Sequence, residues 1–198
     1  MTILPREFYI QYTTHVAREL LGMTLVRSID GQRVAGMIVE TEAYTGRDDL
    51  ASHGHGGKTP RNLPMWGPPG HAYVYLVYGM HWLLNIACEP EDYPAAVLIR
   101  ALEPLEGLDI MQANRAPHPQ LQWTKGPARL TKAMQVDGSH NRIDMTNMTG
   151  GLWVEAGQRI MDNEIHTGPR IGMGRRVHEP WFSMPWRWWI AGNRHVSR

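Results

Sequence analysis

Cysteine is nearly absent from this sequence, which has Cys88 as its one example in 198 residues. A single cysteine excludes a disulfide within the chain, and it excludes iron–sulfur and zinc sites that need several thiolates. Chains without disulfides are typical of reducing compartments, so we expect a cytoplasmic protein. Lysine is scarce too, with 3 residues against 17 arginines, and none lies in the apolar setting that favours a Schiff-base nucleophile.

Long apolar runs are also missing. The most apolar stretch, residues 72–88, is interrupted by Gly79, His81 and Asn85, and it is too short and too polar to span a bilayer. The N-terminal sequence MTILPREFYI lacks the charged and then apolar pattern of a signal peptide. We therefore expect no association with a membrane.

A strong overall charge is absent as well, because the net charge is only +1. The charge is unevenly distributed: residues 1–103 have 8 basic and 11 acidic side chains, whereas residues 104–198 have 12 and 8. Six of those arginines lie within residues 170–198, interleaved with tryptophans. They are either a patch that faces phosphates or solvated residues of a core strand.

The sequence lacks GxSxG, Walker and dinucleotide-binding motifs. Its length and its mixed pattern of strands and short helices predict one α+β domain, residues 1–198. We expect a curved, largely antiparallel sheet, flanking helices and a protruding β-hairpin. The predicted helices are residues 14–22, 105–114 and a segment that begins at Pro127; the predicted strands are 24–29, 33–44, 71–77, 81–88, 96–102, 152–155, 170–173 and 187–191.

The strand 33–44 carries the first candidate site. Its alternation places Glu40, Glu42 and Tyr44 on one face, directly before a long Gly-rich loop over residues 45–71. An acid and an aromatic on a rigid strand beside such a loop are typical of an active site. The same alternation fits a half-buried edge strand with solvated glutamates, and it does not separate Glu40 from Glu42.

A metal site in that loop is a weaker alternative. Asp48, Asp49, His53 and His55 lie within eight positions of one another. Short clusters of this kind in loops rarely hold a metal without further ligands. We therefore predict no metal.

The hairpin over residues 72–88 carries an unusual tip. Gly79 can adopt the positive φ of a tight turn, which leaves Tyr78 and Met80 exposed. Large apolar groups at such a tip suggest insertion, and side chains of this kind can wedge between base steps from the minor groove. The alternative is a tip that folds back onto the body of the protein.

Three further basic residues need an explanation. Arg100 interrupts a buried strand, so it must be paired, and Glu40 or Glu42 is the obvious partner. Arg129 and Lys132, on the helix that begins at Pro127, are candidates for phosphate contacts.

A strand acid, several tyrosines and a wedge together suit an enzyme that extrudes a base from a duplex and directs water at its sugar. Aromatic faces would stack the base, each contributing about 1–3 kcal/mol. An ionised carboxylate would accept a proton from the attacking water.

The segments VETEAYTGRDDLASHGHGGKTPRN, AYVYLVYGM, LNIA, VLIRALEPLEGL and GPARLTKAM occur in this order. In sequence and spacing they resemble the alkyladenine (3-methyladenine) DNA glycosylase family, and the resemblance extends over nearly the whole chain. It implies a monofunctional enzyme without cofactor that flips alkylated or deaminated purines from double-stranded DNA and hydrolyses the N-glycosidic bond, leaving an abasic site. The substrates expected are 3-methyladenine, 7-methylguanine, hypoxanthine and ethenoadenine.

The resemblance also implies roles for individual residues. Glu42 would activate the water, and Arg100 would hold Glu42 and that water. Tyr44, His53 and Tyr75 would enclose the flipped base.

Other residues would meet the DNA. Asn85 would exclude guanine by crowding its 2-amino group, and Tyr78 would fill the gap in the helix. Met80, Lys58 and Arg61, together with Arg129, are expected to contact DNA outside the base pocket.

Some features depart from the family pattern or leave alternatives open. Trp186-Arg187-Trp188 replaces a WRF-like element, and residues 137–150 contain no recognisable motif. The chain lacks the long N-terminal extension of eukaryotic relatives, which indicates a bacterial origin. We expect a monomer that acts on nucleoid DNA. The competing functions are a lesion-recognition protein without catalysis and a nucleosidase that acts on free nucleosides.

Overall fold

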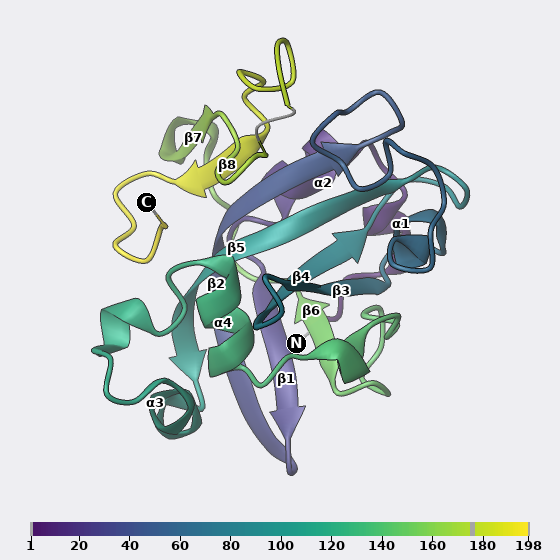
Figure 1. Cartoon of the computed structure of the whole chain (residues 1–198). Helices are drawn as coiled ribbons and strands as arrows, with labels where there is room; N and C mark the ends of the chain where they lie inside the picture. The colour runs from purple at the N-terminus through teal and green to yellow at the C-terminus, as the bar shows by residue number, and fades with distance from the viewer. Residues whose placement is uncertain (1, 175–176, 198) are drawn as a thin grey trace.

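The computed structural model describes residues 2–174 and 177–197. These residues form an α+β fold around a curled antiparallel sheet, as predicted (Figure 1). The α-helices are α1 (Arg6–Tyr9), α2 (Thr13–Glu19), α3 (Leu108–Arg115) and α4 (Pro127–Ala133). The strands are β1 (Thr24–Ile29), β2 (Gln32–Thr45), β3 (Ala72–Val77), β4 (His81–Ala87), β5 (Ala95–Glu106), β6 (Leu152–Glu155), β7 (Ile165–Gly168) and β8 (Arg187–Ile190). Single 3₁₀ turns are Leu63–Trp66, Gln120–Gln122, Gly138–His140 and Asp162–Glu164.

The sheet has the strand order β3-β4-β5-β2-β1-β6 in the described residues, with antiparallel pairing throughout. The long strands β2 and β5 lie side by side through its centre (Figure 1). On the other edge of β2, β1 pairs as far as Met37, and β8 then pairs with residues 40–42. β7 extends this edge by pairing with β8. The C-terminal strands therefore lie next to the two glutamates of β2.

Turn chemistry explains why β1 and β2 form a hairpin. Asp30 and Gly31 connect them with φ angles of 49° and 77°, and both angles suit the tight turn that an Asp-Gly pair favours. Further along β2, the register with β5 shifts on both sides of Glu40. Such irregularities bend a strand and re-aim its side chains.

The main core lies between the sheet and the helices that cover it. Val16 and Ala17 of α2, Met111 of α3, and Leu130 and Ala133 of α4 are fully buried in the same apolar cluster as the central strands. Leu130 and Ala133 share one face of α4 because they are three residues apart. No helix in the described part of the chain has the length and apolarity needed to cross a bilayer.

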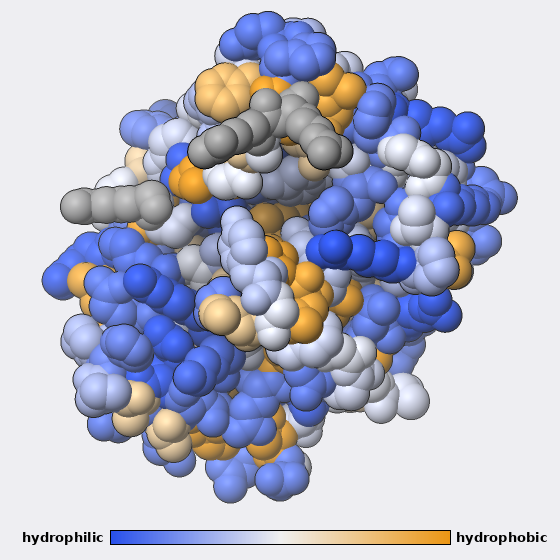
Figure 2. All heavy atoms as spheres, in the orientation of Figure 1, coloured by the Kyte–Doolittle hydropathy of each residue, from blue (hydrophilic) through white to orange (hydrophobic). Residues whose placement is uncertain are grey.

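The β3–β4 hairpin protrudes as predicted. Tyr78 and Gly79 have φ angles of 53° and 70°, so a non-glycine residue adopts the left-handed conformation at the tip. The side chain of Tyr78 is 86% exposed, and that of Met80 is 69% exposed. The tip therefore does not fold back onto the body. On the face of the molecule that Figure 2 shows, apolar surface lies at the centre and hydrophilic residues surround it.

Two sequence predictions of secondary structure are wrong. Residues 170–173 do not form a strand; the strand lies earlier, at β7, because Arg170 turns inward to a buried carboxylate. The helix predicted over 105–114 begins only at Leu108, because β5 continues to Glu106 in its pairing with β2. Gly107, with a φ of 67°, separates strand from helix.

Truncation of Ile99 tests how the core supports the central strands. Ile99 is fully buried on β5, so Ile99→Ala should lower the free energy of unfolding by about 2–5 kcal/mol. Leu105→Ala, at a position that is 47% exposed on the same strand, should change it by less than about 0.5 kcal/mol. Urea denaturation measures both, and equal effects would contradict this description of the core.

Candidate active site

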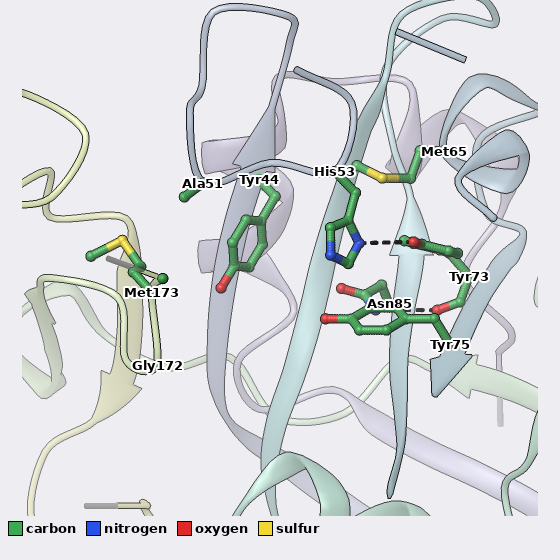
Figure 3. A pocket seen from close by; sticks show the side chains of 10 residues that line it. Tyr44, Ala51, His53, Met65, Tyr73, Tyr75, Asn85, Gly172 and Met173 are labelled. Carbon is green, nitrogen blue, oxygen red and sulfur yellow. Dashed lines mark hydrogen bonds between the residues drawn. The ribbon is translucent and has the colours of Figure 1, made fainter. Parts of the chain in front are cut away.

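A pocket opens where β2, β3 and β4 meet the loop after β2 and the segment after β7. Its volume of about 180 Å³ is in the range of cavities that hold one flat aromatic molecule. The lining residues are Tyr44, Ala51, His53, Met65, Tyr73, Tyr75, Asn85, Gly172, Met173 and Gly174 (Figure 3). Four side chains that the sequence analysis selected for base binding thus lie around one cavity.

Aromatic rings form one wall of this pocket. Tyr73 and Tyr75 lie on one face of β3, with ring centroids 5.1 Å apart, because strand residues two positions apart point the same way. The ring of His53 meets that of Tyr75 edge-on at 4.7 Å, and His53 Nδ1 lies 2.9 Å from the Tyr73 hydroxyl. Tyr44 stands on the other side of the opening (Figure 3). A planar ligand would lie between Tyr44 and the His53–Tyr75 pair.

Two polar groups, the Asn85 amide and the Tyr75 hydroxyl, point into the same pocket (Figure 3). Asn85 donates from Nδ2 to the Tyr73 carbonyl at 3.2 Å, which fixes its amide and leaves the amide oxygen on the pocket side. The Tyr75 hydroxyl points in the same direction (Figure 3). Together they can distinguish ligands by hydrogen bonding and by shape.

Burial shifts the protonation of these groups. Burial, reinforced by the positive charge of Arg61, lowers the pKa of His53, so its imidazole is neutral at pH 7. Burial raises the pKa of Tyr75 to about 12 and raises that of Tyr44 well above its usual value, with the nearby Glu42 carboxylate adding to the shift. The tyrosines therefore remain hydrogen-bond donors at physiological pH.

Glu42 lies directly behind the pocket wall and is wholly buried. Its Oε2 accepts a hydrogen bond from the Tyr44 hydroxyl at 2.8 Å. Its Oε1 accepts from the backbone N–H of Ile171 at 2.7 Å and lies 3.2 Å from Arg100 Nη1. Oε2 thus has one donor in the described structure, and a carboxylate oxygen can accept two.

Glu40, on the same face of β2, accepts four hydrogen bonds. Its oxygens accept hydrogen bonds from Nε of Arg100 at 3.1 Å, Nε of Arg187 at 2.6 Å, and the backbone N–H and hydroxyl of Ser197 at 2.6 and 2.9 Å. Three of these donors share Oε1, and the Ser197 N–H is the one donor to Oε2 in the described structure. The two glutamates differ in their surroundings: Glu42 is bonded to Tyr44, which lines the pocket, whereas Arg100, Arg187 and Ser197 are not among the residues that line it.

Arg100 connects the two glutamates, which confirms the prediction that a carboxylate pairs with it. The residue is 6% exposed and also donates to the Ser197 hydroxyl at 3.3 Å. Burial alone would lower its pKa, but the charges of Glu42 and Glu40 outweigh burial and raise it. The guanidinium is thus a permanent cation beside Glu42.

A second buried ion pair joins the two sides of the pocket. Arg170 donates from Nη1 and Nη2 to the Asp49 carboxylate at 2.6 and 2.9 Å, and both side chains are fully buried. The guanidinium also lies 4.8 Å from the Tyr44 ring centroid. Asp49 precedes His53 in its loop, and Arg170 precedes Ile171, whose N–H donates to Glu42. The pair therefore positions both the loop and the opposite wall.

The basic residues selected for DNA contact are spread around this centre. The guanidinium of Arg61 lies 5.2 Å from the Tyr75 ring centroid and donates to the Leu76 carbonyl at 3.1 Å. Lys58 forms an ion pair with Asp92 and lies over the Trp66 ring at 5.2 Å. Arg129, exposed on α4, donates to Gln122.

Of the three C-terminal arginines that the structure describes, two do not face outward. Arg170 and Arg187 turn inward to buried carboxylates, and Arg194 is exposed. The other three arginines of that segment lie outside the described residues: Arg175, Arg176 and Arg198.

The side chains considered for a metal are engaged elsewhere. Asp49 binds Arg170, His53 lies against Tyr73, and His55 Nδ1 lies 2.6 Å from the Arg47 carbonyl. In residues 2–174 and 177–197, no three His, Cys, Asp or Glu side chains gather as metal ligands would.

Several residues of the site had no clear signal in the sequence. Asp49 and Arg170 are 121 positions apart, so no local pattern joins them. Met65 and residues 172–174 enter the pocket from segments without strand or helix periodicity. The two glycines at positions 172 and 174 were the available hint in the sequence, because glycine lets the backbone approach a ligand closely.

The chain is similar to known proteins over its whole length. The sequence model of the family described as "Methylpurine-DNA glycosylase (MPG)" matches residues 7–194. A protein of Burkholderia cenocepacia (strain HI2424) is 46% identical over 197 residues, which cover 99% of this chain and 91% of the relative. Proteins of Methanocella arvoryzae and Chlorobium phaeovibrioides are 45% and 42% identical, covering 100% of this chain and 97% and 98% of the relatives. All three are named "Putative 3-methyladenine DNA glycosylase".

Neutralising Asp49 should destabilise the protein, because it leaves Arg170 buried without a counter-charge. We expect Asp49→Asn to lower the free energy of unfolding by about 3–5 kcal/mol. The matched control is Asp48→Asn at the exposed neighbouring position, with an expected change within about 0.5 kcal/mol. Thermal and urea unfolding measure both, and similar stability of the two variants would refute the role given to the pair.

Proposed function

Since this chain belongs to the methylpurine-DNA glycosylase family, we propose that it flips damaged purines out of duplex DNA and hydrolyses their N-glycosidic bond. The proposed substrates are 3-methyladenine, 7-methylguanine, hypoxanthine and ethenoadenine, and the product is an abasic site. The observation that supports this most is the pocket itself. A slot between aromatic rings, with a buried carboxylate behind it, suits a flipped base and the water that attacks its sugar.

The base would stack between Tyr44 and the His53–Tyr75 pair. Each stacked ring contributes about 1–3 kcal/mol, which offsets the cost of unstacking the base from the duplex. The neutral imidazole of His53 would accept a hydrogen bond from the Tyr73 hydroxyl at Nδ1, so its proton would lie on Nε2 and would be donated in a hydrogen bond to the base. Asn85 would crowd the 2-amino group of guanine and so disfavour that base.

Glu42 would act as the general base. Its Oε2 accepts one hydrogen bond, from the Tyr44 hydroxyl, and would take the water proton at its second lone pair. Proton transfer of this kind typically accelerates a reaction by about 10²–10⁴-fold. Arg100, paired with the other oxygen, would orient the carboxylate and would hold the water. A carboxylate at this place also stabilises positive charge that develops on the sugar.

Tyr78 would fill the space that the flipped nucleotide leaves, entering from the minor groove with Met80 beside it. The exposed hairpin tip supports this role, because apolar wedges at such positions part base steps. Lys58, Arg61 and Arg129 would contact the DNA around the pocket and the tip.

The enzyme would be monofunctional and would act as a monomer on DNA in the cytoplasm. A lyase reaction needs an amine that attacks the sugar, and none of Lys58, Lys125 and Lys132 lines the pocket. This proposal requires no cofactor, since water is the only other reactant.

Replacement of Glu42 tests the mechanism. Glu42→Gln should slow single-turnover excision of hypoxanthine or ethenoadenine by about 10²–10⁴-fold, with duplex binding retained. The amide keeps the shape and the hydrogen bond from Ile171, but it cannot accept a proton. Alkali cleavage of the abasic product in excess EDTA provides the measurement.

Two comparisons make the result for Glu42→Gln decisive: the Glu91→Gln variant and the wild-type protein. Glu91→Gln, an exposed glutamate, should cut as wild type does. If Glu42→Gln also cut at the wild-type rate, Glu42 would not be the base, and Glu40 would be tested next. If wild type bound the lesion tightly without cutting, the protein would be a recognition protein instead.

Removal of the wedge gives an independent prediction. Tyr78→Ala should slow excision from duplex DNA by about tenfold or more, since each 1.36 kcal/mol of lost support for the flipped state is tenfold. Excision from single-stranded DNA should change little, because no base pair needs to be opened. Tyr12→Ala serves as the control, since Tyr12 is 80% exposed far from the pocket lining. Unchanged duplex excision would remove Tyr78 from the mechanism.

A further inference from the structure

A second cavity lies beside the hairpin tip, between the start of β4 and the helices α3 and α4. Its volume is about 470 Å³, and it is separate from the aromatic pocket. Its lining includes Met80, Trp82, Arg115, His118, Arg129 and Lys132. The surface around α3 and α4 is mainly hydrophilic (Figure 2).

Arg115, the last residue of α3, is a buried cation without a counter-charge. It is 8% exposed, its Nε is buried without a hydrogen-bond partner, and no carboxylate in the described residues pairs with it. Arg100 and Arg170, which are buried to a similar degree, each have a carboxylate partner. A buried charge without a partner is costly, so its presence points to an anion that arrives from outside.

The other groups at this cavity are also positive or neutral. Arg129 and Lys132 reach it from α4, and no acidic residue lines it in the described structure. Burial lowers the pKa of Arg115, and the positive charge of Arg129 lowers it further. An anion at this place would relieve both effects, and the planar guanidinium suits the oxygens of a phosphate.

We propose that this cavity holds a backbone phosphate of the DNA, with Arg115 as its buried cation and Arg129 and Lys132 at its rim. The inference rests on the proposed function, because it requires the hairpin tip to enter a duplex. Met80 borders both the tip and the cavity. With the tip inserted, the DNA strand beside it would therefore run past Arg115.

Binding of undamaged duplex tests this site without depending on excision. The logarithm of the affinity falls with the logarithm of the salt concentration, by about 0.9 per phosphate neutralised. Arg115→Met should therefore reduce this slope by about one, so the variant should lose about 3.5-fold less affinity than wild type between 50 and 200 mM salt. Its melting temperature should stay the same or rise, since the substitution removes a buried unpaired charge.

Two further variants protect the test. Lys132 is exposed on α4, and Lys132→Gln should also lower the salt-dependence slope. This variant keeps the test possible if Arg115→Met fails to fold. Arg159→Met changes an exposed arginine at a different cavity and should keep the wild-type slope. Wild-type slopes for both Arg115→Met and Lys132→Gln would overturn the proposal. If wild-type protein neither bound duplex nor excised a lesion, the proposed function itself would have failed.

Inorganic phosphate separates DNA from a small anion as the source of the phosphate group. At matched ionic strength, free phosphate should compete with duplex for wild type more than chloride does, and this difference should disappear in Arg115→Met. If phosphate raised the melting temperature of wild type but not of Arg115→Met, while the duplex slopes were equal, the site would bind a free anion and the proposal would be wrong.

Discussion

The guanidinium of Arg100 makes it possible for Glu40 and Glu42 to lie buried together on one face of β2. Two carboxylates so close would repel each other and lose hydration, and a cation between them offsets both costs. Arg187 and Ser197 supply further donors, and these reach Glu40 and not Glu42. The order of strands in the sheet places both arginines beside the glutamates: β5 brings Arg100 to one side of β2, and β8 brings Arg187 to the other.

The pocket combines this rigid centre with two irregular segments. Strands fix Tyr44, Tyr75 and Asn85, whereas His53 and the wall at residues 172–174 come from loops. Loops hold a site loosely unless other contacts fix them. The buried pair of Asp49 and Arg170 provides that contact for both loops at once, which explains how segments without regular structure can enclose a shaped cavity.

Local signals explain what the sequence could predict. The Asp30-Gly31 turn, the alternation along β2 and the exposed tip at Tyr78 depend on neighbouring residues, and the structure agrees with each of them. The placement of Arg170 depends on a partner 121 positions away, so its segment was mistaken for a strand. Likewise, nothing near Arg115 in the sequence shows that it is buried without a partner. Long-range packing decides such contacts, and it leaves no periodicity to read.

The donors of Glu40 come from late in the chain, and this has a consequence for synthesis. Arg187 and Ser197 follow Glu40 by 147 and 157 positions, and the N–H of Ile171 follows Glu42 by 129. A nascent chain leaves the ribosome from its N-terminus, so β2 is exposed to water long before these donors exist. Until then its glutamates must remain hydrated, which keeps that part of β2 from packing early. The hydrogen bonds that hold these two buried glutamates are therefore completed last, once residues 171–197 have been made.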